Sequence, residues 1–351
     1  SVRFLPHPGQ AGAPLAAAGA SRAWRLAAAL RSRGCLPMPL DPVIFFFLLG
    51  LSAGILRSDL KIPGVLYESL SIFLLLAIGL KGGVELAKHP VAELALQAAV
   101  VVGVAAIIPL AAFGVLHRIG HFPRSDSAAI AAHYGSVSVV TFAVAATYLA
   151  ARGESAEGYM VAFLVLLEFP ALVIGVLLAR GAGNGTPWGR VLHEVLSGKS
   201  ILLLVGGLLI GWMAGPQGIA PLDRLFFDLF KGFLAFFLLE MGLVVAGRLA
   251  DLRRAGAFLV GFALLMPLVS GLLGIVTGEW LGLSVAGTAL LATLYASASY
   301  IAAPAAMRIA VPEANPALSI GAALGITFPF NLLLGIPTYH WLATMIDGGV
   351  R

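Results

Sequence analysis

The sequence has few charged residues and only one cysteine. Of its 351 residues, 11% are Asp, Glu, Lys or Arg, whereas a soluble domain carries about 25%. So few charges cannot cover a water-exposed surface, which argues against a soluble monomer. The single cysteine, Cys35, excludes an internal disulfide scaffold and a cysteine-based metal cluster. No basic cluster with interleaved aromatic residues occurs, so no nucleic-acid partner is expected.

The sequence is rich in long apolar segments. Hydrophobic residues make up 60% of the chain, and its mean hydropathy is +0.97. A helix of about 20 apolar residues crosses the hydrocarbon core of a bilayer. Candidate spans lie at 42–57, 65–87, 91–116, 127–150, 157–179, 200–214, 232–248, 256–277, 284–306 and 318–346. We therefore predict an all-α membrane protein with about ten transmembrane helices in a lipid bilayer.

Polar segments divide the chain into regions. The Gly-rich segment 181–199 predicts a linker between two five-helix halves, 41–180 and 200–351. Residues 1–40 are rich in Ala, Gly, Pro and Arg and contain no acidic residue. We expect them to be a disordered tail or an extension from a misassigned start codon, with a targeting segment as the alternative. Eleven Lys and Arg residues lie in odd-numbered loops and five in even-numbered ones, so the odd loops, including the linker, are predicted to be cytoplasmic.

The two halves contain similar motifs in the same order. FLLLAIGL at 73–80 resembles FFLLEMGL at 236–243, GSVS at 135–138 resembles ASAS at 296–299, and EFP at 168–170 resembles TFP at 327–329. The offsets are 163, 161 and 159 residues. An odd number of spans per repeat inverts the second half. Inverted repeats are typical of secondary transporters, whose substrate site lies near the midplane between the repeats.

The fourth and ninth spans carry small hydroxyl residues at their centres. YGSVSVVT occupies 134–141, and YASASY at 295–300 is followed by Pro304, which disrupts a helix. An interrupted helix is tolerated at membrane depth where its backbone lines a cavity or binds a ligand. Exposed amides suit an anion and exposed carbonyls suit sodium. We expect Ser136, Ser138, Ser297 and Ser299 to converge, the alternative being close helix packing alone.

Four other polar residues stand out within apolar segments. Glu168 costs about 2.5–3.5 kcal/mol at the centre of a span, so it should face a cavity or a partner. For Glu240 and Asn331, the sequence leaves open whether the side chain has a functional role or bonds to a neighbouring helix. His133 lies at the mouth of the fourth span, and a structural role is favoured for it.

From about residue 40 to 345, the chain resembles the sodium-dependent bicarbonate transporter family of cyanobacteria, the SbtA type, and its bacterial homologues. The similar segments are LKIPGVLYESLSIFLLLAIGLKGGVEL (60–86), HYGSVSVVTFAVA (133–145), LEFPALV (167–173), MGLVVAGRLADLRRAG (241–256) and RIAVPEANPALSIGAALGITFPFNLLLGIPTY (308–339). The resemblance implies two inverted five-span repeats, a core and a gate domain, and a homotrimer. It also implies sodium-coupled bicarbonate uptake, with substrate between the broken fourth and ninth spans, and in some members inhibition by a PII-like cytoplasmic protein.

The family's site motifs can be carried over to this chain. Its GxVSxxT segment falls on 135–141, its fifth-span carboxylate on Glu168, and its ninth-span serines on Ser297 and Ser299. The resemblance thus implies substrate binding at Gly135, Ser136, Val137, Ser138, Ser297, Ala298 and Ser299. Together with the polar residues noted above, it leads us to predict ion binding at Thr141, Glu168, Tyr300, Thr327 and Asn331, with sodium at Ser138, Glu168 and Ser299. The chain departs from the family at Tyr300, where the bicarbonate transporters carry Asp.

These patterns together predict a secondary active transporter that imports a small anion, bicarbonate, coupled to sodium. The alternative is another small anion or proton coupling, because Tyr300 replaces a carboxylate that would bind a hard cation. A channel fits poorly because few charged residues are available to line a pore. A membrane sensor is less favoured. An enzyme is not expected, because no HExxH motif is present and His133 and Ser136 lack a third orienting group. No cofactor is expected besides sodium as the coupling ion.

Overall fold

The structure is a computed structural model that describes residues 41–180 and 188–350. Residues 41–351 are grouped as one compact unit, and throughout the described ranges the regular elements are helices, without a strand. The predicted tail 1–40 and the first part of the predicted linker, 181–187, lie outside the described residues. The remainder of that linker begins with a helix, α10 (Trp188–Ser197).

Eight helical stretches in the described residues are long and apolar enough to cross a membrane. They are Gly64–Leu86, Leu94–Ile119, Arg124–Ala150, Met160–Arg180, Lys199–Leu222, Arg224–Arg248, Gly256–Trp280 and Pro316–Gly348. Two shorter apolar helices, Pro42–Ile55 and Val285–Ala296, fall within the other two predicted spans. The prediction of an all-α, multi-pass membrane protein is therefore confirmed, and the chain belongs in a bilayer.

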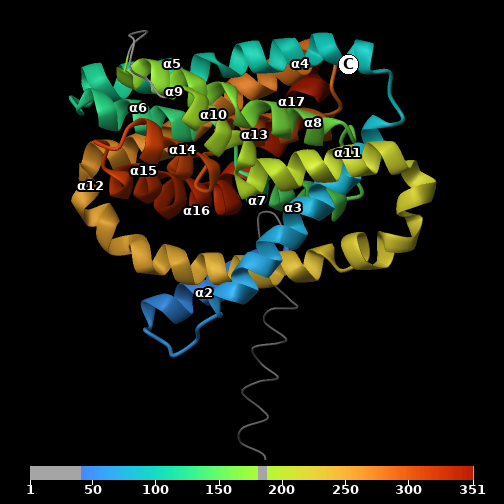
Figure 1. Ribbon diagram of the computed structural model, residues 1–351, viewed down its shortest axis with the longest axis horizontal. Coiled ribbons are helices and arrows are strands. Elements are labelled where there is room, and N and C mark those ends of the chain that lie inside the picture. Colours follow the sequence, from blue (N-terminus) through green and yellow to red (C-terminus); the bar gives the residue numbers. More distant parts are fainter. Residues whose placement is uncertain (1–40, 181–187, 351) are drawn as a thin grey trace, which may run out of the picture. The chain divides into compact units, whose positions relative to one another are not determined.

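The elements follow one another from the first span to the last (Figure 1). The first half contains α2 (Pro42–Ile55), α3 (Gly64–Leu86), α4 (Val91–Ala105), α5 (Ile107–Gly114), α6 (Arg124–Gly135), α7 (Val139–Ala150), α8 (Met160–Glu168) and α9 (Pro170–Arg180). After α10 come α11 (Lys199–Ile219), α12 (Phe230–Trp280), α13 (Val285–Ala296), α14 (Ala302–Ala310), α15 (Pro316–Ile320), α16 (Phe328–Phe330) and α17 (Ile336–Val350). Two π-helical turns, Gly321–Thr327 and Asn331–Gly335, flank α16.

The long helix α12 is two spans joined at a glycine. Gly256 has φ 78°, in the left-handed region that glycine adopts without the steric cost of a side chain. The chain therefore turns there between the spans Arg224–Arg248 and Gly256–Trp280. Figure 1 draws α12 in yellow to orange, with α2 lying along its first half.

Glycines allow two pairs of helices to pack at very short range. An added Cβ on Gly79 of α3 would lie 2.7 Å from the Leu204 carbonyl oxygen of α11, and one on Gly211 would collide with the Leu80 carbonyl oxygen. In the same way, a Cβ on Gly242 of α12 would collide with the backbone of α2. Small residues let transmembrane backbones approach closely, which is a main source of helix association in lipid. The set α2, α3, α11 and the first half of α12 is called the paired set below.

The interrupted helices lie inside the protein rather than at its periphery. The apolar window of Arg124–Ala150 is 100% buried, whereas that of Lys199–Leu222 is 17% buried. Every residue of α13 from Ala286 onward is also buried. The fourth and ninth predicted spans are thus shielded from lipid, where only an internal site would tolerate their polar groups.

Candidate functional site

Both predicted helix interruptions are present. The helix α6 ends at Gly135 and α7 begins at Val139, while α13 ends at Ala296 and α14 begins at Ala302. Ser136 and Ser297 both adopt extended backbone, with ψ of 169° and 165°. Serine favours such ends because its hydroxyl offers the backbone a hydrogen bond that competes with the helix. The segments 136–138 and 297–301 are called the first and second breaks.

One hydrogen bond joins the two breaks directly, and another joins the second break to the last turn of α6. The Ser138 backbone N–H donates to the Ser297 Oγ at 2.9 Å. The Ser299 backbone N–H donates to the His133 carbonyl oxygen at 2.8 Å, just before the first break. Backbone groups that the interrupted helices leave without helical partners thus bond across the crossing. The serines that the sequence predicts to converge do so here.

Serine hydroxyls also fix where the helices resume. The Ser138 Oγ accepts from the Thr141 backbone N–H at 3.2 Å and from the Thr141 Oγ1 at 3.0 Å, which caps α7. The Ser299 Oγ accepts from the Ala303 backbone N–H at 3.2 Å, in the first turn of α14. Capping a first turn contributes roughly 0.5–2 kcal/mol. The positive ends of the α7 and α14 dipoles therefore both lie at the crossing, which favours an anion there.

Glu168 supplies a carboxyl group to the first break. It is the last residue of α8, it is 2% exposed, and its Oε2 accepts from the Ser136 Oγ at 3.0 Å. The Ser136 Oγ also lies 3.4 Å from the Glu168 carbonyl oxygen. This side chain faces both a hydrogen-bond partner and the cavity described next.

A small central cavity lies at the crossing. Its volume is about 10 Å³, and it is lined by Val137, Ser138, Val139, Glu168, Ser200, Ser299, Tyr300 and Ile301. The Ser200 Oγ and Tyr300 Oη are buried and lack a hydrogen-bond partner among the described residues, although the Tyr300 hydroxyl faces Ser138. The cavity holds about one water molecule and is smaller than bicarbonate, so this conformation is closed.

The structure brings some predicted site residues to the central cavity and leaves others away from it. Val137, Ser138, Glu168, Ser299 and Tyr300 line it. The remaining predicted residues lie outside this lining: Gly135, Ser136, Thr141, Ser297, Ala298, Thr327 and Asn331. Among these, Ser136, Thr141 and Ser297 hold the breaks in place through the bonds described above.

Thr327 and Asn331 make hydrogen bonds elsewhere in the tenth predicted span. The Thr327 Oγ1 donates to the Ala263 carbonyl oxygen at 2.7 Å. The Asn331 Nδ2 donates to the Ala296 carbonyl oxygen at 2.8 Å, and its Oδ1 accepts from the Tyr339 hydroxyl at 3.0 Å. Asn331 thereby bonds to the carbonyl group of the last residue of α13, so its side chain links two helices.

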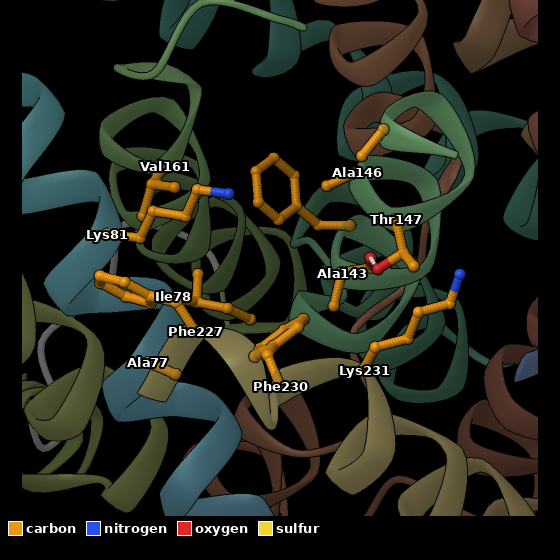
Figure 2. A pocket seen from close by; sticks show the side chains of 12 residues that line it. Ala77, Ile78, Lys81, Ala143, Ala146, Thr147, Val161, Phe227, Phe230 and Lys231 are labelled. Carbon is orange, nitrogen blue, oxygen red and sulfur yellow. Dashed lines mark hydrogen bonds between the residues drawn. The ribbon is translucent and has the colours of Figure 1, made fainter. Parts of the chain in front are cut away.

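A larger cavity, called the lysine cavity, lies beside α7 (Figure 2). Its volume is about 250 Å³, and α3, α7 and the start of α12 contribute most of its wall. Lys81 and Lys231 are its two charged lining residues, and Figure 2 shows them on different sides of the cavity, with Ala143, Ala146 and Thr147 of α7 nearby. The Lys231 Nζ lies 3.1 Å from the Asp41 Oδ2, whereas Lys81 has no ion pair among the described residues.

Shared lining residues relate the lysine cavity to the central cavity. A further cavity of about 10 Å³, the apolar constriction, shares Ile78 and Ala143 with the lysine cavity. It shares Val139 and Ile301 with the central cavity. The apolar constriction therefore lies between the lysine cavity and the central cavity.

Sequence reasoning missed Ser200 and the two lysines of the lysine cavity. Ser200 is an ordinary serine in the first turn of α11, and it reaches the crossing because α11 packs against α8. Lys81 and Lys231 stand in the sequence as two lysines next to apolar segments, without a motif around them. No local motif marks any of these residues, because their role in lining a cavity depends on which helices pack together.

The oxygen atoms of the central cavity suit a hard cation such as sodium. Hydroxyl oxygens come from Ser138, Ser200, Ser299 and Tyr300, and Glu168 adds a carboxylate. Hard cations prefer oxygen ligands, charged oxygen above all. Two of these hydroxyls lack a partner, and such buried groups call for a ligand, an ion or water.

Comparison with known proteins adds one finding. The sequence profile of the family described as the Na⁺-dependent bicarbonate transporter superfamily matches residues 42–344. The match runs from α2 into α17 and includes both breaks and every residue of the central cavity. No curated protein matches the chain.

Proposed function

Because the chain belongs to the Na⁺-dependent bicarbonate transporter superfamily, we propose that it is a secondary active transporter that imports bicarbonate with sodium across a bacterial inner membrane. The observation that carries this proposal is the crossing of two helix breaks around a closed cavity with unpartnered hydroxyls. An anion at the crossing would lie near the positive ends of α7 and α14. Sodium would be held by Glu168 with the serine hydroxyls.

Equivalent hydrogen bonds in the two halves support an inverted repeat. The Tyr295 hydroxyl donates to the Val101 carbonyl oxygen in the third span at 2.6 Å. Tyr134 precedes Tyr295 by 161 residues, and its hydroxyl bonds to the Thr327 Oγ1 at 2.6 Å. The Thr327 Oγ1 itself donates to the Ala263 carbonyl oxygen in the eighth span. Val101 and Ala263 are offset by 162 residues. Both tyrosines thus reach corresponding spans, directly in one half and through Thr327 in the other.

The helix pairs support the same symmetry. The first span, α2, packs along the seventh, in α12, whereas the second span, α3, packs along the sixth, α11. A twofold axis that relates two five-span halves exchanges the first span with the sixth and the second span with the seventh. The pair of the first and seventh spans therefore maps onto the pair of the sixth and second spans. This exchange is expected of inverted repeats that meet at a midplane site.

The transport step would be movement of the paired set against the helices that carry the breaks. The lysine cavity lies between α3 and α12 on one side and α7 on the other. The central cavity lies between Ser200 of α11 and the two breaks. Separating the two groups of helices on the side of the lysine cavity would widen the apolar constriction and admit substrate. Separating them on the other side would release it, as alternating access requires.

The lysine cavity is the proposed outward access route. Residues 227–231 and the 150–158 loop lie around it and its neighbour of about 390 Å³, and these belong to even-numbered loops predicted to face outward. Lys81, which has no ion pair among the described residues, would raise the local concentration of an anion before it reaches the constriction, whereas the Lys231 charge is balanced by Asp41. The cavity is otherwise largely apolar, which strengthens the field of the Lys81 ammonium group.

Uptake by purified protein in proteoliposomes tests the proposal. We expect labelled bicarbonate to accumulate in a sodium gradient, and Ser138→Ala or Glu168→Gln to lower uptake by about tenfold or more. Ser270→Ala is the matched control, because Ser270 is a buried serine of α12 outside the cavities. Unchanged uptake in both site variants would exclude the assigned site.

A homologous function with another small anion, or with proton coupling, is the second candidate. The replacement of a family carboxylate by Tyr300 is the feature that favours it. Thermal stabilisation of the purified protein, scanned across sodium, bicarbonate and other small anions, separates these possibilities because a ligand that binds only the folded state raises apparent stability. Stabilisation by another anion, or uptake driven by a pH gradient without sodium, would support this candidate against the first.

The proposed assembly is a homotrimer, inhibited on its cytoplasmic side by a PII-like protein. The resemblance to the bicarbonate transporters supports both features. Native mass spectrometry of the detergent-solubilised protein tests the trimer, and a monomer under those conditions would contradict it. Loss of uptake on adding a PII-like protein inside the liposomes tests the regulator.

A further inference from the structure

A separate pocket lies on the other side of the first break from the lysine cavity. Its volume is about 70 Å³, and its lining includes Ala129 and His133 of α6, Pro304 and Arg308 of α14, and Ser319 of α15. The helix α6 precedes the first break and α7 follows it, so this pocket and the lysine cavity lie toward opposite ends of the fourth span. The residues after α14 belong to an odd-numbered loop, which the charge count predicts to be cytoplasmic.

His133 presents an unused hydrogen-bond acceptor. The residue is 1% exposed, and its Nδ1 lies 2.7 Å from the Ala129 carbonyl oxygen. A carbonyl oxygen only accepts, so Nδ1 carries the proton, and in the neutral ring Nε2 is an acceptor. The Nε2 atom is buried and lacks a partner among the described residues. A buried acceptor without a donor is unfavourable, which calls for a ligand with a hydroxyl group or for water.

Arg308 gives the same pocket a positive charge. It is the one charged residue among those that line the pocket. It is exposed, and no carboxylate pairs with it within the part of the chain that the structure describes. A guanidinium offers several donors in one plane, which match the oxygens of a carboxylate or carbonate group. The pocket therefore combines a cation at its mouth with a buried acceptor.

We propose that this pocket is a second anion site, selective for a small oxyanion that carries a hydroxyl group. Arg308 donates to the charged oxygens, and the His133 Nε2 accepts from the hydroxyl. Bicarbonate has both groups, whereas nitrate has no hydroxyl. A volume of about 70 Å³ has room for a few water molecules or one such anion. The inference rests on the proposed function, because it places a bicarbonate site on the side toward which substrate is released.

The pocket is connected to the crossing through one residue. The His133 carbonyl oxygen accepts from the Ser299 backbone N–H at 2.8 Å, and Ser299 lines the central cavity. Its Oγ in turn accepts from the Ala303 N–H at the start of α14, the helix that carries Arg308. An anion between His133 and Arg308 therefore bridges the helix before the first break and the helix after the second.

Cysteine labelling reports on this pocket without relying on transport. Cys35 is the only native cysteine, so Cys35→Ser gives a background in which Ala314→Cys, a partly exposed lining position, is the single thiol. We expect sodium bicarbonate to slow its alkylation by N-ethylmaleimide and sodium nitrate to do so more weakly. Thr147→Cys in the lysine cavity is the matched control position.

Substitutions at the two binding residues decide the interpretation. Arg308→Gln should weaken protection by both anions by about tenfold, the loss expected for a hydrogen bond to a charged group. His133→Phe should weaken protection by bicarbonate to the level of nitrate, and His133→Gln, whose amide oxygen can accept, should restore part of it. At Thr147→Cys, neither substitution should change labelling.

Two results would overturn the inference. In the first, bicarbonate and nitrate slow alkylation at Ala314→Cys equally, and His133→Phe leaves that protection unchanged. In the second, neither anion slows alkylation at Ala314→Cys. The latter result with intact bicarbonate uptake rejects this second site and leaves the proposed function standing. Protection that requires Arg308 and His133 in a protein that transports no bicarbonate rejects the transport function and retains the site.

Discussion

Ser297→Ala removes the side-chain hydrogen bond that joins the two breaks. The Ser297 Oγ accepts from the Ser138 N–H at 2.9 Å and donates to the Leu294 carbonyl oxygen at 2.8 Å, and the residue is 1% exposed. Alanine leaves the Ser138 N–H buried without a partner, which costs about 1–3 kcal/mol. Hydrogen bonds between transmembrane helices average about 0.6 kcal/mol and reach about 1.7 kcal/mol. We therefore expect a loss of about 1–2 kcal/mol in the free energy of unfolding.

Ser299→Ala provides the comparison. It removes the cap of α14, worth about 1 kcal/mol, but the Ser299 backbone N–H still bonds to the His133 carbonyl oxygen. Both variants should therefore lose similar stability, while Ser297→Ala alone loosens the junction between the breaks.

Unfolding by SDS titration in mixed micelles, together with bicarbonate uptake, measures these effects. Ser270→Ala, at a buried serine of α12, controls for the loss of a hydroxyl group as such. We expect both serine variants to lower uptake, Ser297→Ala by loosening the junction between the breaks and Ser299→Ala by removing an oxygen atom of the central cavity, whereas Ser270→Ala should keep it. A stability of Ser297→Ala equal to wild type, or uptake by Ser297→Ala equal to that of Ser270→Ala, would refute the role given to the bond between the breaks.

Three further substitutions test other parts of the structure. Lys81→Met should raise KM for bicarbonate by about fivefold with little change in maximal rate, because it removes about 1 kcal/mol of attraction between the lysine and the anion across water. The rise in KM should be smaller at high ionic strength. The control variant Lys61→Met should leave KM unchanged. Gly211→Val should lower the melting temperature, since its side chain collides with α3 at a cost of about 1–3 kcal/mol, whereas Gly103→Ala meets open space and should not. Glu168→Gln should abolish sodium stimulation of uptake without unfolding the protein, because a neutral amide of the same shape removes a buried charge; sodium dependence that survives would contradict the assigned ion site.

The helices and their interruptions followed from the local sequence. Apolar segments of sufficient length must form helices in lipid, because no water is present to satisfy the backbone. Serine-rich motifs, the second of them followed by Pro304, end those helices for equally local reasons. The convergence of the breaks needed one more premise, the internal repeat, which pairs the motif at 135–138 with that at 296–299.

The partners of each polar residue depended on tertiary structure. Asn331 and Thr327 look like Ser138 in sequence, as polar groups in apolar spans, but their side chains bond to the Ala296 and Ala263 carbonyl oxygens and lie outside the central cavity. Ser200 carries no motif, yet α11 places it there.

Hydropathy and local motifs were sufficient to place this chain in a membrane, to locate its helix breaks and to identify its family. Helix packing was needed to show which oxygens share the central cavity, that Lys81 and Lys231 line one cavity, and that His133 and Arg308 line another. This division arises because hydropathy places a helix in lipid without selecting its neighbour. Neighbours are selected by close contacts such as those of Gly79 and Gly211 between α3 and α11, which bring together residues far apart in the chain.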